Sequence, residues 1–141
     1  MARPWAPRVL DLAGLEQEAQ ALWRELPAGG VVWLSGELGS GKTAFVQALA
    51  RAAGAARASS PSFALLHQYA SPEGVLAHAD CYRLRMVDEA RDLDLAAVAV
   101  HARALVIEWP ERAGAHAPPP FAHYRFTHVE RSDQRSLERV A

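Results

Sequence analysis

The first third of the chain alternates between helical spacing of apolar residues and short continuous apolar runs. Apolar side chains recur at helical spacing over residues 12–26, which predicts an amphipathic helix. Asp11, directly before it, is a residue type that caps helix N-termini, and residues 8–10 are expected to form a short strand. The run 31–35 predicts a buried strand, and the composition of 42–53 predicts a second helix.

Farther along the chain, apolar segments are shorter and are separated by turn-forming residues. The strongly apolar sequence ALVIE is typical of a central strand buried on both faces. No internal repeat or long linker interrupts the pattern, so we expect a single domain over residues 1–141. The predicted fold is α/β, a P-loop NTPase-like sheet flanked by helices, with an antiparallel hairpin and C-terminal strands. The expected later elements are hairpin strands over 63–70 and 75–80, a helix over 88–101, a strand over 104–108, and closing strands over 121–130 and 137–140.

Composition narrows the class of protein. A chain of 141 residues that is 50% hydrophobic and 22% charged is typical of a globular domain with a real core. The net charge of -1 does not favour a broad nucleic-acid-binding face. The single cysteine, Cys81, cannot form an internal disulfide, and no apolar run approaches the ~18 residues of a membrane span. The N-terminal stretch lacks the apolar region of a secretory signal, so we expect a cytoplasmic protein.

The sequence GELGSGKT at residues 36–43 fits the phosphate-binding pattern G-x-x-x-x-G-K-[ST]. Such a Walker A loop holds phosphates on backbone N–H groups and a helix N-terminus. Its lysine reaches the β- and γ-phosphates, and its hydroxyl binds Mg²⁺. Lys42 is the only lysine in the chain, and the predicted strand–loop–helix context argues against a chance glycine-rich turn. The predicted nucleotide-binding residues here are Glu37, Leu38, Gly39, Ser40, Gly41, Lys42, Thr43 and Ala44.

A phosphate loop that performs chemistry also needs carboxylates at the carboxyl ends of nearby strands, where ligands of open α/β sheets bind. Glu108 ends one predicted strand and Asp80 ends another. Each could instead be a solvated acid at a strand end, which is common. Given the loop, we predict Lys42, Asp80 and Glu108 as catalytic residues, and Thr43 and Glu108 as Mg²⁺ ligands.

ATP is the expected nucleotide. Familiar GTPases select guanine with an Asn-Lys-x-Asp element, but this chain has no asparagine and its only lysine is Lys42. A small-molecule kinase would need an acceptor-binding segment and usually an arginine-rich lid. Arg83 and Arg85 are candidates for a lid, but no acceptor-binding segment is visible. An ATPase is therefore favoured over a kinase.

Three further strings follow the loop in order: SPSF at 60–63, HADCYRL at 78–84 and EWPE at 108–111. Together with the loop, this set closely resembles the bacterial TsaE family. Its members are small P-loop ATPases required for threonylcarbamoyladenosine (t6A) modification of tRNA. The resemblance runs from about residue 12 to residue 112. The loop alone is shared by many NTPases, whereas the set of four motifs is specific.

The resemblance implies a role for each matching residue. Ser62 would supply a switch-loop hydroxyl that faces the γ-phosphate and the metal. Asp80 would be a carboxylate that binds metal or orients water, and Glu108 a Walker B-like acid. Trp109 would lie beside the nucleotide.

The resemblance also implies that Tyr82 and Arg83 belong to the active-site surface or to a surface that faces a partner. The chain departs from the family pattern in two places. Glu37 stands where Asp is usual, and segment 88–98 lacks the Leu-Gly pair expected after its acidic start. The second departure concerns partner contacts rather than phosphate chemistry.

By resemblance, the protein would bind ATP with Mg²⁺ and hydrolyse it as a component of the t6A system. TsaD and TsaB would be its partners, and they would carry out the carbamoyl transfer. Hydrolysis is expected to be slow for the chain alone and faster in the complex, with any tRNA contact indirect. Two alternatives stay open: a stand-alone small-molecule kinase, and a nucleotide-gated binding module without useful hydrolysis.

Overall fold

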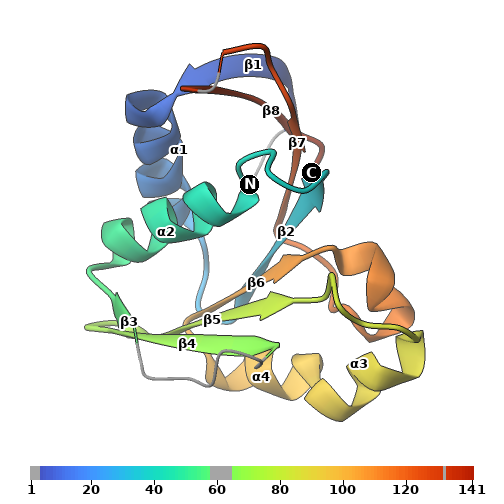
Figure 1. The fold of residues 1–141 in the computed structure, drawn as a ribbon. Coiled ribbons are helices and arrows are strands. Elements are labelled where there is room, and N and C mark those ends of the chain that lie inside the picture. Colours follow the sequence, from blue (N-terminus) through green and yellow to red (C-terminus); the bar gives the residue numbers. More distant parts are fainter. Residues whose placement is uncertain (1–3, 58–64, 132) are drawn as a thin grey trace.

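The computed structural model describes residues 4–57, 65–131 and 133–141, and one eight-stranded sheet runs through this part of the chain (Figure 1). The switch-loop prediction for Ser62 lies outside the described residues. The elements are β1 (Trp5–Asp11), α1 (Leu12–Glu25), β2 (Gly30–Gly36), α2 (Lys42–Ala53), β3 (Ala56–Arg57), β4 (Leu66–Ser71), β5 (Gly74–Asp80), α3 (Val87–Leu93), α4 (Leu95–His101), β6 (Ala104–Glu108), the 3₁₀ turns η1 (Pro110–Arg112) and η2 (Gly114–His116), β7 (Ala122–Thr127) and β8 (Gln134–Arg139).

The sheet has a parallel centre and antiparallel margins. Its strand order is β1-β8-β7-β2-β6-β5-β4-β3. The central strands β7, β2, β6 and β5 pair in parallel, whereas β4 pairs antiparallel with β5 and β8 pairs antiparallel with β7 and β1. The α/β prediction, the antiparallel hairpin and the C-terminal strands are therefore confirmed.

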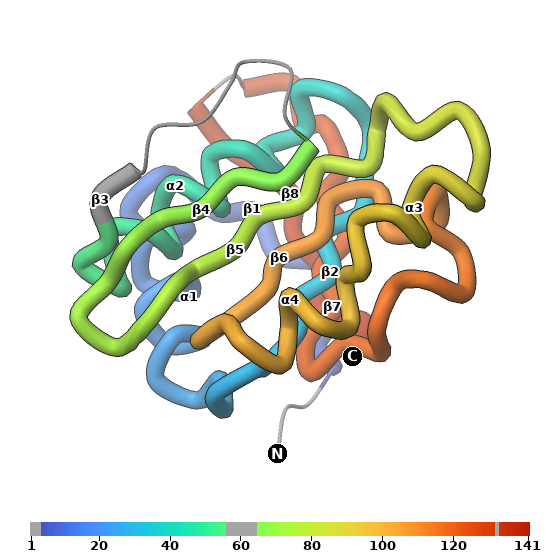
Figure 2. Tube along the Cα trace, turned by 90° about the horizontal axis from the view of Figure 1, so that it is seen from below, coloured from blue at the N-terminus to red at the C-terminus, as the bar shows by residue number. Residues whose placement is uncertain are grey.

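Helices cover both faces of the sheet, with α1 and α2 on one side and α3 and α4 on the other (Figures 1 and 2). Side-chain alternation along β2 divides the core accordingly. Val32 and Leu34 belong to the cluster beneath α1 and α2, while Val31 and Trp33 pack in the cluster beneath α3 and α4. A strand that buries both faces in this way lacks polar alternation, which explains the continuous apolar run in the sequence.

Helix α2 is held in place by aromatic contacts with β7. The Phe45 ring lies 5.0 Å from the Tyr124 ring and 5.8 Å from the Phe126 ring, and all three side chains are fully or almost fully buried. Tilted and edge-on aromatic pairs at such distances stabilise the fold beyond the burial of their apolar surface. Because Phe45 lies in the first turn of α2, these contacts fix the loop that precedes the helix.

Two predictions for the later chain were wrong in detail. The helix expected over 88–101 is interrupted at Asp94, which has a left-handed backbone (φ 48°) and caps α4 by accepting from the Ala97 N–H at 3.4 Å. An aspartate that bonds its own downstream backbone competes with a continuous helix. The closing strands were also misplaced: the first ends at Thr127 rather than residue 130, and the second begins at Gln134 rather than residue 137.

Within the described residues, no helix combines the length and the hydropathy needed to cross a bilayer.

Candidate functional site

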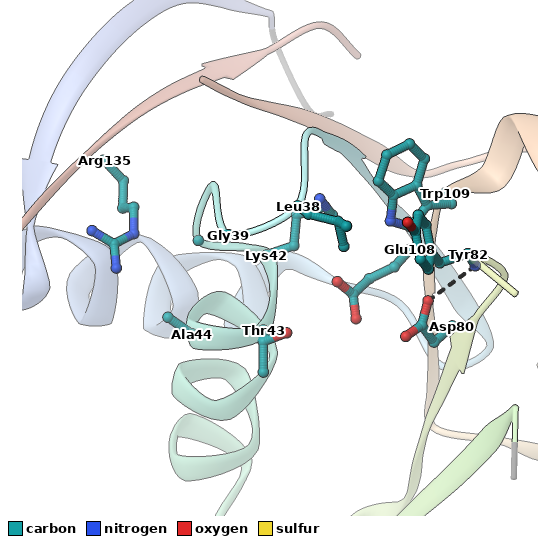
Figure 3. A pocket seen from close by; sticks show the side chains of 11 residues that line it. Leu38, Gly39, Lys42, Thr43, Ala44, Asp80, Tyr82, Glu108, Trp109 and Arg135 are labelled. Carbon is teal, nitrogen blue, oxygen red and sulfur yellow. Dashed lines mark hydrogen bonds between the residues drawn. The ribbon is translucent and has the colours of Figure 1, made fainter. Parts of the chain in front are cut away.

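A cavity of about 240 Å³ opens between the loop after β2 and the carboxyl ends of β5 and β6 (Figure 3). The loop and the start of α2 form one wall, and the strand ends form the other. This position follows from the parallel centre of the sheet, because parallel strands place their carboxyl ends at one edge. The described residues that line the cavity are Leu38, Gly39, Gly41, Lys42, Thr43, Ala44, Asp80, Tyr82, Glu108, Trp109 and Arg135.

Glycines shape the loop because two positions exclude any side chain. Gly36 has φ 138°, and a Cβ atom there would lie 2.5 Å from the backbone oxygen of Phe126. Gly41 has φ 115°, and a Cβ atom there would lie 2.5 Å from Cδ of Arg135. Both backbone conformations belong to the region that glycine occupies readily. The loop therefore keeps its backbone close to the cavity, as a phosphate cradle requires.

Lys42 is buried and its ammonium group is held by the loop. Nζ donates to the backbone oxygen of Gly36 at 2.5 Å and to that of Glu37 at 2.7 Å, and it lies 4.7 Å from the centre of the Trp109 ring. Burial lowers the pKa of Lys42 below its usual value, and the nearby carboxylates of Glu108 and Asp80 partly offset this effect. The ammonium is thus fixed between the loop and the opposite wall.

The two predicted acids lie side by side. Asp80 and Glu108 are register partners at the ends of the parallel strands β5 and β6, and both side chains line the cavity. Glu108 is only 5% exposed, and its Oε2 lies 2.5 Å from Nε2 of His78. Asp80 Oδ1 accepts from the backbone N–H of Tyr82 at 3.1 Å. A buried carboxylate needs such partners, and His78 fixes the orientation of Glu108.

Two aromatic rings and an arginine cover the cavity wall that carries Asp80 and Glu108. The Tyr82 and Trp109 rings are 5.1 Å apart, and the Arg112 guanidinium lies over both. Arg112 also donates to the backbone oxygen of Tyr82 at 2.7 Å. Trp109 has φ 58°, which is strained for a bulky residue by roughly 1–2 kcal/mol, and the sharp turn points the ring toward Lys42.

Three predicted residues do not line the cavity. The Glu37 side chain is 86% exposed, so this residue meets the site only through its backbone oxygen. Ser40, within the loop, is buried, and its Oγ lies 3.5 Å from Lys42 Nζ. Arg83 is exposed and does not line the cavity. Ser62 lies outside the described residues. The loop, acid and aromatic residues named above were all predicted from the sequence.

Sequence reasoning missed His78, Arg112 and Arg135. The spacing of His78 held a signal: residues two apart on a strand share a face, so His78 faces the same side as Asp80. Arg112 follows the EWPE string directly and was assigned no role from the sequence. Arg135 carries no local signal, because only the pairing of β8 with β1 and β7 brings it to the loop.

The donor set suits a magnesium nucleotide. Within the described residues, no three His, Cys, Asp or Glu side chains gather closely enough to form a metal site of their own. Mg²⁺ is typically held by one or two carboxylates together with phosphates and water. One exposed threonine hydroxyl and two carboxylates beside a glycine cradle match that preference. The residues present therefore fit a phosphate-bound Mg²⁺ and not a stand-alone metal centre.

Comparison with a solved structure supports the fold. The crystal structure of Bacillus subtilis YdiB superposes with a TM-score of 0.69 at 18% identity, covering 99% of this chain and 88% of that one. At this level of identity the likeness concerns the fold alone.

Sequence comparison identifies the family. The family model for "Threonylcarbamoyl adenosine biosynthesis protein TsaE" matches residues 10–139. Proteins named tRNA threonylcarbamoyladenosine biosynthesis protein TsaE are similar to this chain. The Synechocystis protein is 34% identical (72% of this chain, 68% of the relative), and the Aquifex aeolicus protein is 36% identical (67% and 68%). The Streptomyces coelicolor protein is 38% identical (69% and 68%). The chain therefore belongs to the TsaE family, which takes part in the biosynthesis of t6A in tRNA.

Proposed function

We propose that this protein binds ATP in the loop cavity and hydrolyses it as part of t6A biosynthesis. The observation that supports this best is the pairing of Asp80 with Glu108 opposite the phosphate loop. Two carboxylates would repel the phosphates of a nucleotide unless a cation such as Mg²⁺ lay between them, and the second acid is then placed to orient a water. Their presence on the opposite wall therefore favours chemistry over phosphate binding alone.

Each residue of the loop wall has a binding role in this proposal. The backbone N–H groups of the loop and of the α2 N-terminus would hold the phosphates, and Lys42 would neutralise the β- and γ-phosphate oxygens. Thr43 and Glu108 would hold Mg²⁺, which supplies charge neutralisation during phosphoryl transfer. Asp80 would accept a hydrogen bond from the attacking water and so orient it toward the γ-phosphorus. The products are ADP and inorganic phosphate.

His78 would keep the Glu108 carboxylate in its working orientation. The imidazole is buried, and it stacks on His67 with ring centres 5.8 Å apart. A residue that hydrogen-bonds to a metal-binding carboxylate fixes the orientation of that ligand without contacting the substrate. His78 is therefore a positioning residue in this proposal.

We assign TsaD and TsaB as partners because the chain belongs to the t6A system. Among the described lining residues, Lys42 is the only cation on the side of the cavity where the two acids lie (Figure 3). P-loop NTPases that lack a second cation beside the γ-phosphate often receive an arginine from a partner, which can add ~10³-fold or more to the rate. Slow hydrolysis alone and faster hydrolysis in the complex are expected on this basis.

Phosphate release from ATP tests the proposal directly. The purified chain is assayed alone and with TsaB and TsaD, beside a Lys42→Ala variant. Weak release alone that rises with the partners and disappears in the variant supports an ATPase of the t6A system. Release that is fast alone and indifferent to the partners removes the assignment of partners. ADP formation without free phosphate, together with a phosphorylated small molecule, would instead indicate a kinase.

An assay of t6A formation in the complete system distinguishes the proposed ATPase from a module that only binds nucleotide. If nucleotide binding alone were needed, a Glu108→Ala variant would support t6A formation on tRNA as well as the unmodified protein. The proposal predicts a loss of t6A formation after the first turnover, while ATP binding persists.

A further inference from the structure

Arg135, at the beginning of β8, reaches the phosphate loop from the far end of the chain. It pairs with Leu10 of β1, and its neighbour Ser136 pairs with Thr127 of β7. From this position the side chain lines the same cavity, on the side of Gly39 and Ala44 and away from the two acids (Figure 3). Among the described lining residues, it is the single arginine.

The stem of Arg135 packs on the loop itself. A Cβ atom added to Gly41 would lie 2.5 Å from Cδ and 2.7 Å from Nε of Arg135, so the two residues touch closely. Nη1 donates to the backbone oxygen of Gln134 at 2.8 Å, which restricts the guanidinium further. The side chain is half-buried. Its charged group is thus held beside the cavity at a defined place.

The charges of the cavity are distributed unevenly. Asp80 and Glu108 lie at one end, and Lys42 Nζ is tied to the carbonyl groups at the start of the loop and to the Trp109 ring at that same end. Arg135 lies at the opposite end, beside the first turn of α2 (Figure 3). A nucleotide whose γ-phosphate meets the acids and Lys42 therefore directs its α-phosphate and nucleoside toward Arg135.

We propose that Arg135 binds the α-phosphate of the nucleotide and contributes to the affinity for ADP and ATP equally. This inference rests on the proposed function, since it assumes that the loop holds a nucleoside polyphosphate. A guanidinium presents several donors in a planar fork that matches phosphate oxygens, and a hydrogen bond to a charged group is stronger than a neutral one. The α-phosphate does not change during hydrolysis, so Arg135 acts in binding and not in the chemical step.

A purely structural role is the competing explanation, because arginine stems also stabilise by packing. Substitution by methionine separates the two roles. Arg135→Met keeps the apolar stem that covers Gly41 and removes the charge, whereas Arg135→Lys keeps a charge without the fork. Arg131→Met is the matched control, because Arg131 lies on the same C-terminal hairpin, is exposed and pairs with Asp133.

The experiment measures Kd for ADP and ATP by calorimetric titration and kcat for phosphate release. For Arg135→Met we expect Kd to rise about 10- to 100-fold for both nucleotides, the effect of one lost charge-assisted hydrogen bond. The kcat at saturating ATP should change by less than about 3-fold, and Tm should stay close to that of the unmodified protein. Arg135→Lys should recover part of the affinity, and Arg131→Met should bind as the unmodified protein does.

Three results would overturn the inference. Unchanged ADP affinity in Arg135→Met with a lower Tm indicates packing alone. A fall in kcat with unchanged ADP affinity places the guanidinium at the γ-phosphate. Equal losses in Arg135→Met and Arg131→Met indicate a general effect of net charge. The unmodified protein tests the proposed function separately. If it binds and hydrolyses ATP, the proposed function stands whichever of these three results appears. If it binds no nucleotide, the proposed function itself fails.

Discussion

The two walls of the cavity are built in different ways. The loop wall comes from one continuous stretch, residues 36–44, and its positive character arises from backbone N–H groups and Lys42. The acid wall is assembled from the ends of two strands, where Asp80 and Glu108 meet as register partners. Glu108 is oriented by His78, at the margin of its motif string, and the backbone at Tyr82 is held by Arg112, which lies outside the strings.

In the proposed function, the loop wall accounts for phosphate binding and the acid wall accounts for hydrolysis. The loop wall can hold phosphates wherever a strand, a glycine loop and a helix follow one another. The acid wall needs a sheet in which β5 and β6 are parallel and end at the same level. Variants in the loop wall should therefore impair binding and turnover together, and variants in the acid wall should impair turnover alone.

The largest effect is expected for Lys42→Ala. Loss of the ammonium removes charge stabilisation in the transition state, so phosphate release should fall at least ~10²–10³-fold, and ATP affinity should fall as well. Phosphate release and calorimetric titration measure the two quantities. Circular dichroism confirms that the variant is folded. Normal ATP affinity with lost turnover would place Lys42 functionally with the acid wall.

Glu108→Gln should lower turnover by ~10²-fold and leave ATP binding nearly unchanged. The amide keeps the shape of the side chain but removes the charge that would bind Mg²⁺. Glu111→Gln is the matched control, because Glu111 is an exposed acid in the adjacent turn η1. A large loss of ATP affinity in Glu108→Gln would contradict the division between the walls.

His78→Asn should lower turnover by ~10-fold, since partners behind a metal-binding carboxylate typically contribute 10- to 100-fold. The loss should appear in kcat and be smaller when Glu108→Gln is already present, because the two residues then act as one unit. His101→Asn, an exposed histidine outside the cavity, serves as control. Additive losses in the double variant would show that His78 does not act through Glu108.

The smallest effect concerns pH and the stability of the nucleotide-free protein. Because burial lowers the pKa of Lys42 in the folded state, the unfolded chain binds more protons between that lowered pKa and the ordinary value of 10.5. The free energy of unfolding should therefore rise with pH in this window, relative to a Lys42→Met variant. Chemical denaturation of both proteins at pH 7 and pH 10 measures the difference. A constant or falling difference would contradict the burial effect.

Local patterns predicted the elements beside the loop with high precision. The helix expected over 42–53 coincides with α2, and the strand expected over 104–108 coincides with β6. Both have strong local signals, a glycine-ended helix after the loop and a continuous apolar run. The helix over 88–101 was misjudged because the competition of the Asp94 side chain with the helix backbone does not alter hydrophobic spacing.

The amino-acid sequence by itself determined the loop wall, because the glycines, Lys42 and Thr43 lie within one short stretch whose conformation depends on local backbone freedom. It also named both acids, since strand ends follow from apolar runs. Only the tertiary structure decided that Asp80 faces Glu108, that His78 holds Glu108, and that Arg135 lies on Gly41. These contacts depend on strand order and register, which arise when distant segments bury their apolar faces together, and no local pattern specifies them.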